Sequence, residues 1–191
     1  SADEEKTRDE VLEPLFDAWQ YVDSVSPKPP RNLDEDEFWP PAEDDAQTAM
    51  DLIEDEEWLG ALAASSRAVL QRRIHKNFWT TPALQRAEFN KARALYELGH
   101  YRFAADTFNS FLEDYPTNVE GHYWLGITYW LGGRSDLALH HLNAAYQFDA
   151  NHPDAAKAQE IYDQIKNNEQ PDLPLPMMIK QQRETENETP E

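Results

Sequence analysis

Histidines and acid-rich runs are the residues of this chain whose types could support chemistry. Six histidines occur, but no two stand four positions apart with a glutamate between them, which is the spacing of a zinc metalloprotease helix. His140 and His141 are neighbours, and on a helix their side chains point about 100° apart. We therefore expect no metal site, and we interpret the histidines as ordinary surface or interhelical residues.

The acid-rich runs at residues 34–37, 43–45 and 54–57 invite comparison with calcium loops. They lack the regular alternation of ligands and the central glycine of such loops. We interpret them as solvating charge and as residues that begin helices. The sequence also has no glycine-rich phosphate loop, no nucleophile elbow, no Ser/His/Asp arrangement and no cysteine. It therefore predicts a protein that is not an enzyme and needs no cofactor.

The formal net charge of −20 is unevenly distributed along the 191 residues. Residues 1–57 hold 20 acidic and 4 basic side chains, residues 58–118 hold 5 and 8, and residues 119–191 hold 12 and 5. Such an acidic chain repels nucleic acid and anionic lipid, and its longest apolar run, residues 123–131, is too short to span a membrane. We expect a protein or peptide partner, no nucleic acid and no direct membrane insertion.

The basic centre of the chain has two interpretations. It is either a solvated helix face or a docking site for acidic sequence, including the chain's own residues 34–37. Its members are Arg67, Arg72, Arg73, Lys76, Arg86, Lys91, Arg93 and Arg102.

The elements that must position these residues show an internal repeat of 34 positions. Ala104 aligns with Ala138, and each unit reads as a helix that ends near a glycine, a second helix and a polar turn. Small side chains let two helices cross closely, and large ones fill the space between neighbouring hairpins. The other matched pairs are Gly99 with Gly133, Phe108 with Leu142, Phe111 with Ala145, and Leu95 with Tyr129.

Residues 119–152 resemble the tetratricopeptide repeat, whose marks are a large residue, Leu-Gly, Tyr, and then Ala, a large apolar residue and Ala. The residues that carry this resemblance are Trp124, Leu125, Gly126, Tyr129, Ala138, Leu142 and Ala145. Residues 85–118 are similar to the same repeat, but they depart from its pattern at Glu88, Lys91 and Phe111. Their matching residues are Ala92, Leu95, Gly99, Tyr101, Ala104, Phe108 and Pro116.

The resemblance implies an all-α fold, a short solenoid of helical hairpins with two clear repeats and one degenerate repeat. We expect a helical domain at residues 42–166. Its parts are repeats at about 42–75, 85–118 and 119–152 and a capping helix at 153–166. Before it, residues 1–41 read as an acidic helix followed by a proline-rich extended segment, and after it residues 167–191 read as a polar, flexible tail.

The inner surface of the first helices is the usual ligand surface of the family that the chain resembles. Aromatic side chains there can clamp an apolar peptide or helix, and Asn or Arg can fix its backbone or a carboxylate. The alternative is that these side chains pack against the chain's own termini. The residues expected on this surface are Arg86, Phe89, Asn90, Arg93, Tyr96, Tyr123, Ile127 and Trp130.

Some members of that family grip a C-terminal carboxylate with Lys, Asn and Arg side chains spread over three repeats. Asn90 fits one such position, but Ala46, Met50, Glu120 and Trp124 occupy others and cannot serve. We therefore do not expect a clamp of this kind.

These observations predict a non-catalytic scaffold, adaptor or assembly factor that binds a partner peptide or helix. The alternative is a structural subunit of a larger complex or a homo-oligomer, with the groove filled by the chain's own termini. We expect a cytoplasmic protein, or a periplasmic one from which a signal has been removed, because the N-terminus shows no targeting pattern.

Overall fold

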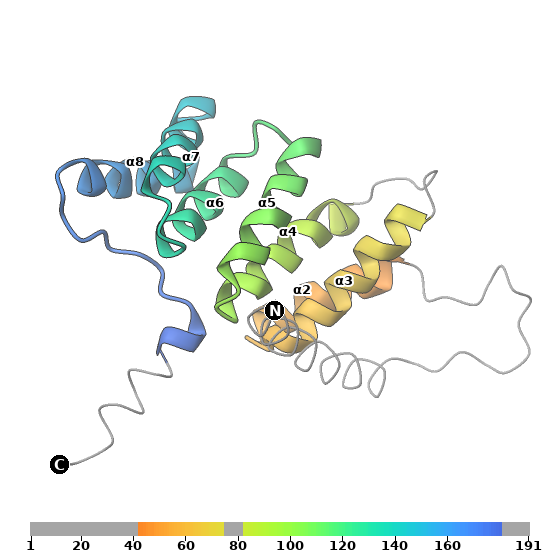
Figure 1. Cartoon of the computed structure of the whole chain (residues 1–191). Helices are drawn as coiled ribbons and strands as arrows, with labels where there is room; N and C mark the ends of the chain where they lie inside the picture. Colours follow the sequence, from red (N-terminus) through yellow and green to blue (C-terminus); the bar gives the residue numbers. More distant parts are fainter. Residues whose placement is uncertain (1–41, 75–81, 181–191) are drawn as a thin grey trace, which may run out of the picture. The chain divides into compact units, whose positions relative to one another are not determined.

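The computed structural model describes residues 42–74 and 82–180, and within these ranges it contains helices and no strand. This confirms the expected all-α fold. The helices, coloured along the sequence in Figure 1, are α2 (Ala42–Glu54), α3 (Trp58–Ile74), α4 (Pro82–Glu97), α5 (Tyr101–Asp114), α6 (Val119–Leu131), α7 (Ser135–Phe148) and α8 (Pro153–Lys166). The helix and extended segment expected within residues 1–41 lie outside the described residues, as does the tail beyond residue 180.

The chain divides into two compact units within α4, between Ala94 and Leu95, and each is described by itself. Unit 1 contains α2, α3 and α4 as far as Ala94. Unit 2 contains the end of α4, the helices α5 to α8 and the segment that follows them. The division into head, helical domain and tail that the sequence suggests stays a prediction.

Alanines set the packing distance between the helices of unit 1. Ala46 and Ala49 of α2 are fully buried, as are Ala64 and Ala68 of α3 and Ala87 of α4. Side chains this small allow helices to approach each other closely. The core of unit 1 therefore combines close helix contacts at alanines with larger buried side chains, namely Trp58, Leu62 and Phe89.

A buried ion pair joins α2 to α3 in the core of unit 1. Asp45 lies in the acidic first turn of α2, and its carboxylate contacts the guanidinium of Arg67 on α3. Both side chains are less than a tenth exposed. Arg67, which the sequence places in the basic centre, is therefore a structural residue here and not part of a solvated face.

Two glycines end the first helix of each hairpin in unit 2. Gly99 and Gly133 have φ angles of 80° and 74°, in the left-handed region that glycine adopts without strain. In both turns the N–H of the next residue donates to the carbonyl five positions earlier, at 2.8 Å. This is the Schellman arrangement, and its recurrence after 34 residues shows that the sequence repeat is a repeat of backbone geometry.

The core of unit 2 repeats in the same way. Ala104 and Ala138 are fully buried, and so are the large partners Phe108 and Leu142. Gly126 allows α6 to approach α7, since a Cβ atom there would lie 2.8 Å from Cγ of Leu142. The predicted pairing of small and large side chains is confirmed at these positions.

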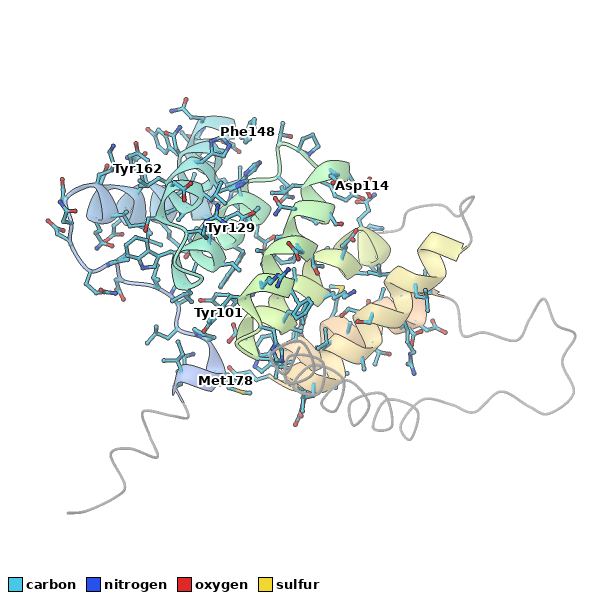
Figure 2. The ribbon with its side chains drawn as sticks, viewed as in Figure 1. Tyr101, Asp114, Tyr129, Phe148, Tyr162 and Met178 are labelled. Atoms are coloured by element: carbon cyan, nitrogen blue, oxygen red, sulfur yellow. The ribbon has the colours of Figure 1, made fainter. Side chains whose placement is uncertain are left out.

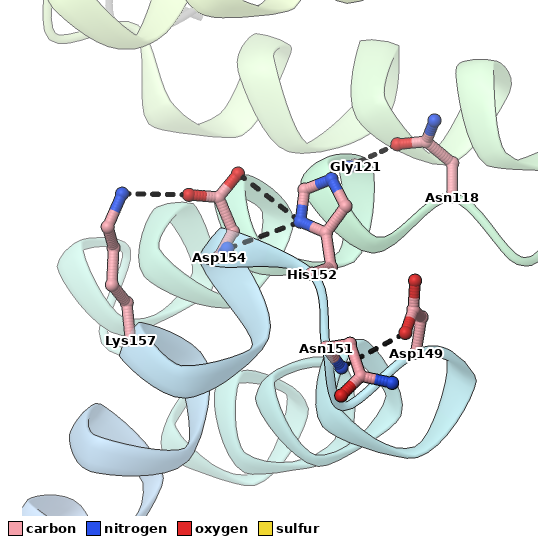
Figure 3. A network of polar contacts seen from close by, with 7 residues as sticks. All are labelled: Asn118, Gly121, Asp149, Asn151, His152, Asp154 and Lys157. Atoms are coloured by element: carbon pink, nitrogen blue, oxygen red, sulfur yellow. Dashed lines mark hydrogen bonds and ion pairs between the residues drawn. The ribbon is translucent and has the colours of Figure 1, made fainter.

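The polar turns that close the two clear repeats also match. Asn118 precedes α6, and its Oδ1 accepts from the N–H of Gly121 at 2.7 Å; His152 precedes α8, and its Nδ1 accepts from the N–H of Asp154 at 3.2 Å (Figure 3). These caps satisfy N–H groups that the first turn of a helix leaves without an internal partner. Both caps therefore begin a helix at equivalent positions 34 residues apart.

Part of the segment that the sequence predicts as a polar, flexible tail lies within the described residues. Residues 167–176 have no regular secondary structure, and residues 177–180 form one helical turn. Pro171, Leu173 and Pro176 are nevertheless buried. Prolines reduce the conformational entropy that ordering must overcome, and the neighbouring apolar residues gain from burial.

Candidate protein-binding surfaces

The eight residues predicted to bind a partner divide equally between the two units. Arg86, Phe89, Asn90 and Arg93 lie on α4 within unit 1, and we call this set the arginine face. The aromatic face consists of Tyr96 at the end of α4 together with Tyr123, Ile127 and Trp130 on α6, all within unit 2. The role of both faces in binding stays a prediction.

The arginine face combines half-buried cations with buried neighbours. Its four residues stand at positions i, i+3, i+4 and i+7 and so share one side of α4. The guanidinium of Arg86 lies 4.7 Å from the ring centre of Phe89, and that of Arg93 lies 6.0 Å from the ring centre of Trp58. Such cation–π contacts hold the planar group against the ring. Both arginines are thereby positioned rather than freely mobile.

Asn90 is the unusual member of the arginine face. Its side chain is only 4% exposed, yet among the described residues its Nδ2 has no hydrogen-bond partner. Leaving a buried donor unsatisfied costs about 1–3 kcal/mol. Such a group is uncommon in a folded protein and calls for an explanation. Chemically, the amide can donate to a peptide carbonyl, and the arginines can donate to a carboxylate.

The aromatic face is already covered within unit 2. Tyr96 and Ile127 are fully buried, Tyr123 is 4% exposed, and only Trp130 is half-buried. Trp124 connects the two tyrosines, with ring centres 5.3 Å from Tyr96 and 5.4 Å from Tyr123, both edge to face. A partner can therefore reach these residues only if the groups that cover them move.

One of those groups belongs to the segment that follows α8. We call residues 171–178 the strap. The hydroxyl of Tyr96 donates to the carbonyl of Pro174, and the N–H of Met177 donates to Oε2 of Glu97 at 2.9 Å. At Gly99 an added Cβ would lie 2.7 Å from Sδ of Met178, so the thioether occupies the space that glycine leaves open.

Glu97 is a residue of this site that the sequence analysis missed. Its side chain is 7% exposed and stands in the last turn of α4, where the helix dipole disfavours negative charge. A carboxylate at such a position indicates that it accepts a hydrogen bond from a donor outside its own helix. The buried carboxylate and burial itself both raise the pKa of the nearby Tyr101 hydroxyl, with burial the larger cause.

Residues 89–161 match the tetratricopeptide repeat family. This part of the chain is a tetratricopeptide repeat region. No curated protein matches the chain. Tetratricopeptide repeats generally mediate protein–protein interaction, so binding of a protein partner is the function that the repeat region carries. None of the helices that the structure describes combines the length and apolar character needed to cross a bilayer.

The tetratricopeptide region also contains a histidine pair between α6 and α7. The Nδ1 atoms of His122 and His141 lie 2.9 Å apart, and Nε2 of His122 is 3.0 Å from the carbonyl of Pro116. Since that carbonyl can only accept, His122 carries its proton on Nε2. Its Nδ1 is then an acceptor, and Nδ1 of His141 donates to Nδ1 of His122. Among the described residues, no group of three or more metal-ligating side chains comes together.

Aromatic rings enclose this pair. The ring of His141 stacks on Tyr129, and the ring of His122 packs on Phe148. Tyr129 and Phe148 are labelled in Figure 2. Burial lowers the pKa of His141 to about 4, with His122 and His140 as further causes. Burial also lowers the pKa of His122, and repulsion from His140 acts in the same direction. The pair is therefore an interhelical, neutral contact at physiological pH, rather than the surface histidines that were the other expectation.

Proposed function

We propose that this protein is a non-catalytic scaffold or adaptor that holds a segment of a partner protein on its arginine face. The observation that supports the proposal most strongly is the unsatisfied amide of Asn90 beside two positioned arginines. A buried amide without a partner is costly in the unbound protein. Asn90 is only 4% exposed, so a ligand reaches it once the groups that cover it move. Binding a peptide carbonyl then removes that cost and so favours the complex.

The chemistry of the arginine face selects the kind of segment. Asn90 suits a main-chain carbonyl, and Arg86 and Arg93 suit a carboxylate. Residues 58–118 carry a net positive charge, so an acidic segment meets a favourable local field despite the acidic chain as a whole. The proposed ligand is therefore a partner segment with acidic side chains and an accessible backbone.

Affinity capture from the native source, quantified by mass spectrometry, tests this function. The test variant carries Arg86→Ala and Arg93→Ala, and the matched control carries Arg134→Ala and Lys166→Ala, which remove two exposed cations outside the basic centre. We expect a partner that the control retains and the test variant loses by about 10-fold or more. Equal retention by both variants, with thermal melts showing both folded, would contradict the proposal.

A second candidate is a structural subunit or homo-oligomer whose binding groove is filled by its own terminus. The contacts of the strap with Tyr96 and Glu97 favour it for unit 2. Exposed apolar side chains such as Leu70 and Phe148 (53% and 47% exposed) also suit burial by neighbouring subunits. Light scattering separates the candidates, since a monomer across concentrations favours the adaptor and a stable oligomer favours the subunit.

The cytoplasm is the compartment we propose, with the periplasm as the alternative. A chain without cysteine is compatible with a reducing and with an oxidising compartment. Fractionation of the native source, followed by detection of the protein, distinguishes them.

A further inference from the structure

We propose that the aromatic face is a second peptide-binding site that accepts an extended, proline-containing peptide with apolar side chains at alternate positions. In this proposal the strap is an internal ligand that occupies the site until a partner peptide displaces it. The inference concerns unit 2 alone, and it can fail or hold independently of the function proposed for the arginine face.

The burial pattern of the strap shows how it is bound. Burial alternates from residue 171 to residue 174, where Pro171 and Leu173 are buried and Asp172 and Pro174 are exposed. This alternation is that of an extended chain with one side against a surface. It ends at Leu175, which is half-buried, and Pro176, which is buried. Prolines fix their own φ angle and push the preceding residue toward extended conformations. The strap therefore reaches its bound shape at a low entropic cost.

Among the described residues, main-chain atoms hold the strap at three points. The N–H of Asp172 donates to Oε1 of Gln164 on α8 at 3.1 Å. The carbonyl of Pro174 accepts from Tyr96, and the N–H of Met177 donates to Glu97. Any peptide offers a carbonyl, but only a residue other than proline offers an N–H. In extended-peptide recognition, such backbone contacts give affinity and pockets for alternate side chains give specificity. The position after the last proline of the ligand must therefore be a residue other than proline.

Side-chain space narrows the ligand further. The carboxylate of Glu97 is buried, so it repels an acidic residue beside the N–H that it accepts. The absence of a Cβ at Gly99 leaves room for Sδ of Met178, and a flexible thioether fills such irregular spaces well. The ligand read from these contacts is Pro-x-Leu-Pro-x-Pro, then a residue other than proline, and then an apolar, unbranched residue.

The way the strap is attached allows it to be displaced. It follows α8 through exposed residues 167–170, and Met178 at its far end is 40% exposed. Residues 167–169 turn back on α8 through backbone hydrogen bonds, and a connection this short gives an internal ligand an effective concentration of about a millimolar. A partner of the same chemistry must exceed that competition, so weakening the strap should unmask the site.

Fluorescence anisotropy with a labelled peptide of the sequence of residues 170–180 tests this proposal on the full chain. The strap-weakened variant carries Leu173→Asp and Pro176→Asp, which place charge at two buried positions. We expect it to bind the peptide at least about 10-fold more tightly than the natural chain, because internal competition is removed. A peptide with aspartate in place of the leucine should bind neither protein.

Two further variants locate the peptide on the aromatic face. Tyr96→Phe, added to the strap-weakened chain, removes one hydroxyl donor and should weaken binding by about 2- to 12-fold. Tyr146→Phe removes a hydroxyl from the surface of α7 and should leave binding unchanged. The pair Arg86→Ala and Arg93→Ala should also leave it unchanged, which separates this site from the arginine face. Equal effects of Tyr96→Phe and Tyr146→Phe would overturn the assignment.

A measurement on the natural chain covers the case in which the strap-weakened variant does not fold. Saturating unlabelled peptide should speed hydrogen exchange at the Met177 amide, since displacement frees the N–H from Glu97. Unchanged exchange at full saturation would refute displacement. A dimer in light scattering, dissociated by the same peptide, would show that the strap's ligand site serves a second copy of this chain, and it would also overturn the proposal.

Discussion

The arginine face and the aromatic face come from the same predicted ligand surface, yet the molecule treats them in opposite ways. On the aromatic face, each polar group that contacts the strap has a partner, and the apolar rings are covered. On the arginine face, the amide of Asn90 is buried and unsatisfied among the described residues. The position of a residue within the repeat therefore determines on which surface its side chain lies. It does not determine whether another part of the chain covers that surface.

Physical chemistry accounts for the contrast. A cluster of aromatic rings exposes a large apolar area, which is costly in water and promotes association. A segment of alternating apolar residues and prolines lowers that cost at little loss of entropy. Arginines, in contrast, are well solvated at a surface and need no internal cover. The four predictions below test this contrast, from the largest expected effect to the smallest.

The largest effect should come from the packing that supports the aromatic face. Leu142→Ala removes a fully buried side chain beside Gly126, and we expect it to reduce the free energy of unfolding by about 2–5 kcal/mol. Urea denaturation followed by circular dichroism measures this loss. Leu70→Ala, at an exposed position of α3, is the control and should change stability by less than about 0.5 kcal/mol.

Acid should weaken unit 2 through its histidine pair. The pKa values of His122 and His141 are lowered in the folded state, so the stability of the neutral pair is fully present above about 6.5, the unfolded value. It is lost as the pH falls through about 4, the value for His141. Thermal melts between pH 7 and pH 4 should show this decline. His141→Phe should flatten it, and an unchanged profile would exclude the pair as the cause.

The next effect should distinguish the two faces by its sign. Asn90→Leu replaces an unsatisfied buried amide with an apolar side chain of similar size, so we expect stabilisation by about 1 kcal/mol. Capture of the partner should fall at the same time, because leucine cannot donate a hydrogen bond to the partner. The variant would then gain stability and lose binding. Chemical denaturation gives the first quantity. Destabilisation by Asn90→Leu would mean that the amide is satisfied in solution.

An effect of similar size and opposite sign should come from the corresponding change on the aromatic face. Tyr96→Phe removes a hydroxyl that donates to Pro174, and we expect it to reduce the free energy of unfolding by about 0.5–1.5 kcal/mol. The same denaturation experiment measures it. Opposite signs for Asn90→Leu and Tyr96→Phe would support the contrast, and equal signs would remove it.

Much of the fold could be predicted because its rules are local or periodic. The 34-residue spacing of Ala104 and Ala138 places small side chains where hairpins cross, and glycine at 99 and 133 provides the left-handed residue that each turn requires. These requirements act through residue type, so they leave a visible pattern in the sequence.

The site was less predictable because its decisive contacts use main-chain atoms far apart in sequence. Tyr96 and Pro174 are separated by 78 residues, and Glu97 and Met177 by 80. A carbonyl or an N–H is present at nearly every position, so no side-chain pattern marks the one that is used. The predicted docking of residues 34–37 on the basic centre lies outside the described residues and stays a prediction.

The contacts of the strap have a consequence for how the protein can be shortened. A truncation that ends after α8 would follow the repeat boundaries, yet it would strip the cover from Tyr96 and leave the Glu97 carboxylate without the Met177 N–H. Such a fragment should aggregate or attach to unrelated apolar peptides, and its apparent partners would then be artefacts of the cut. For work with isolated fragments, the useful C-terminal limit is the helical turn at residues 177–180.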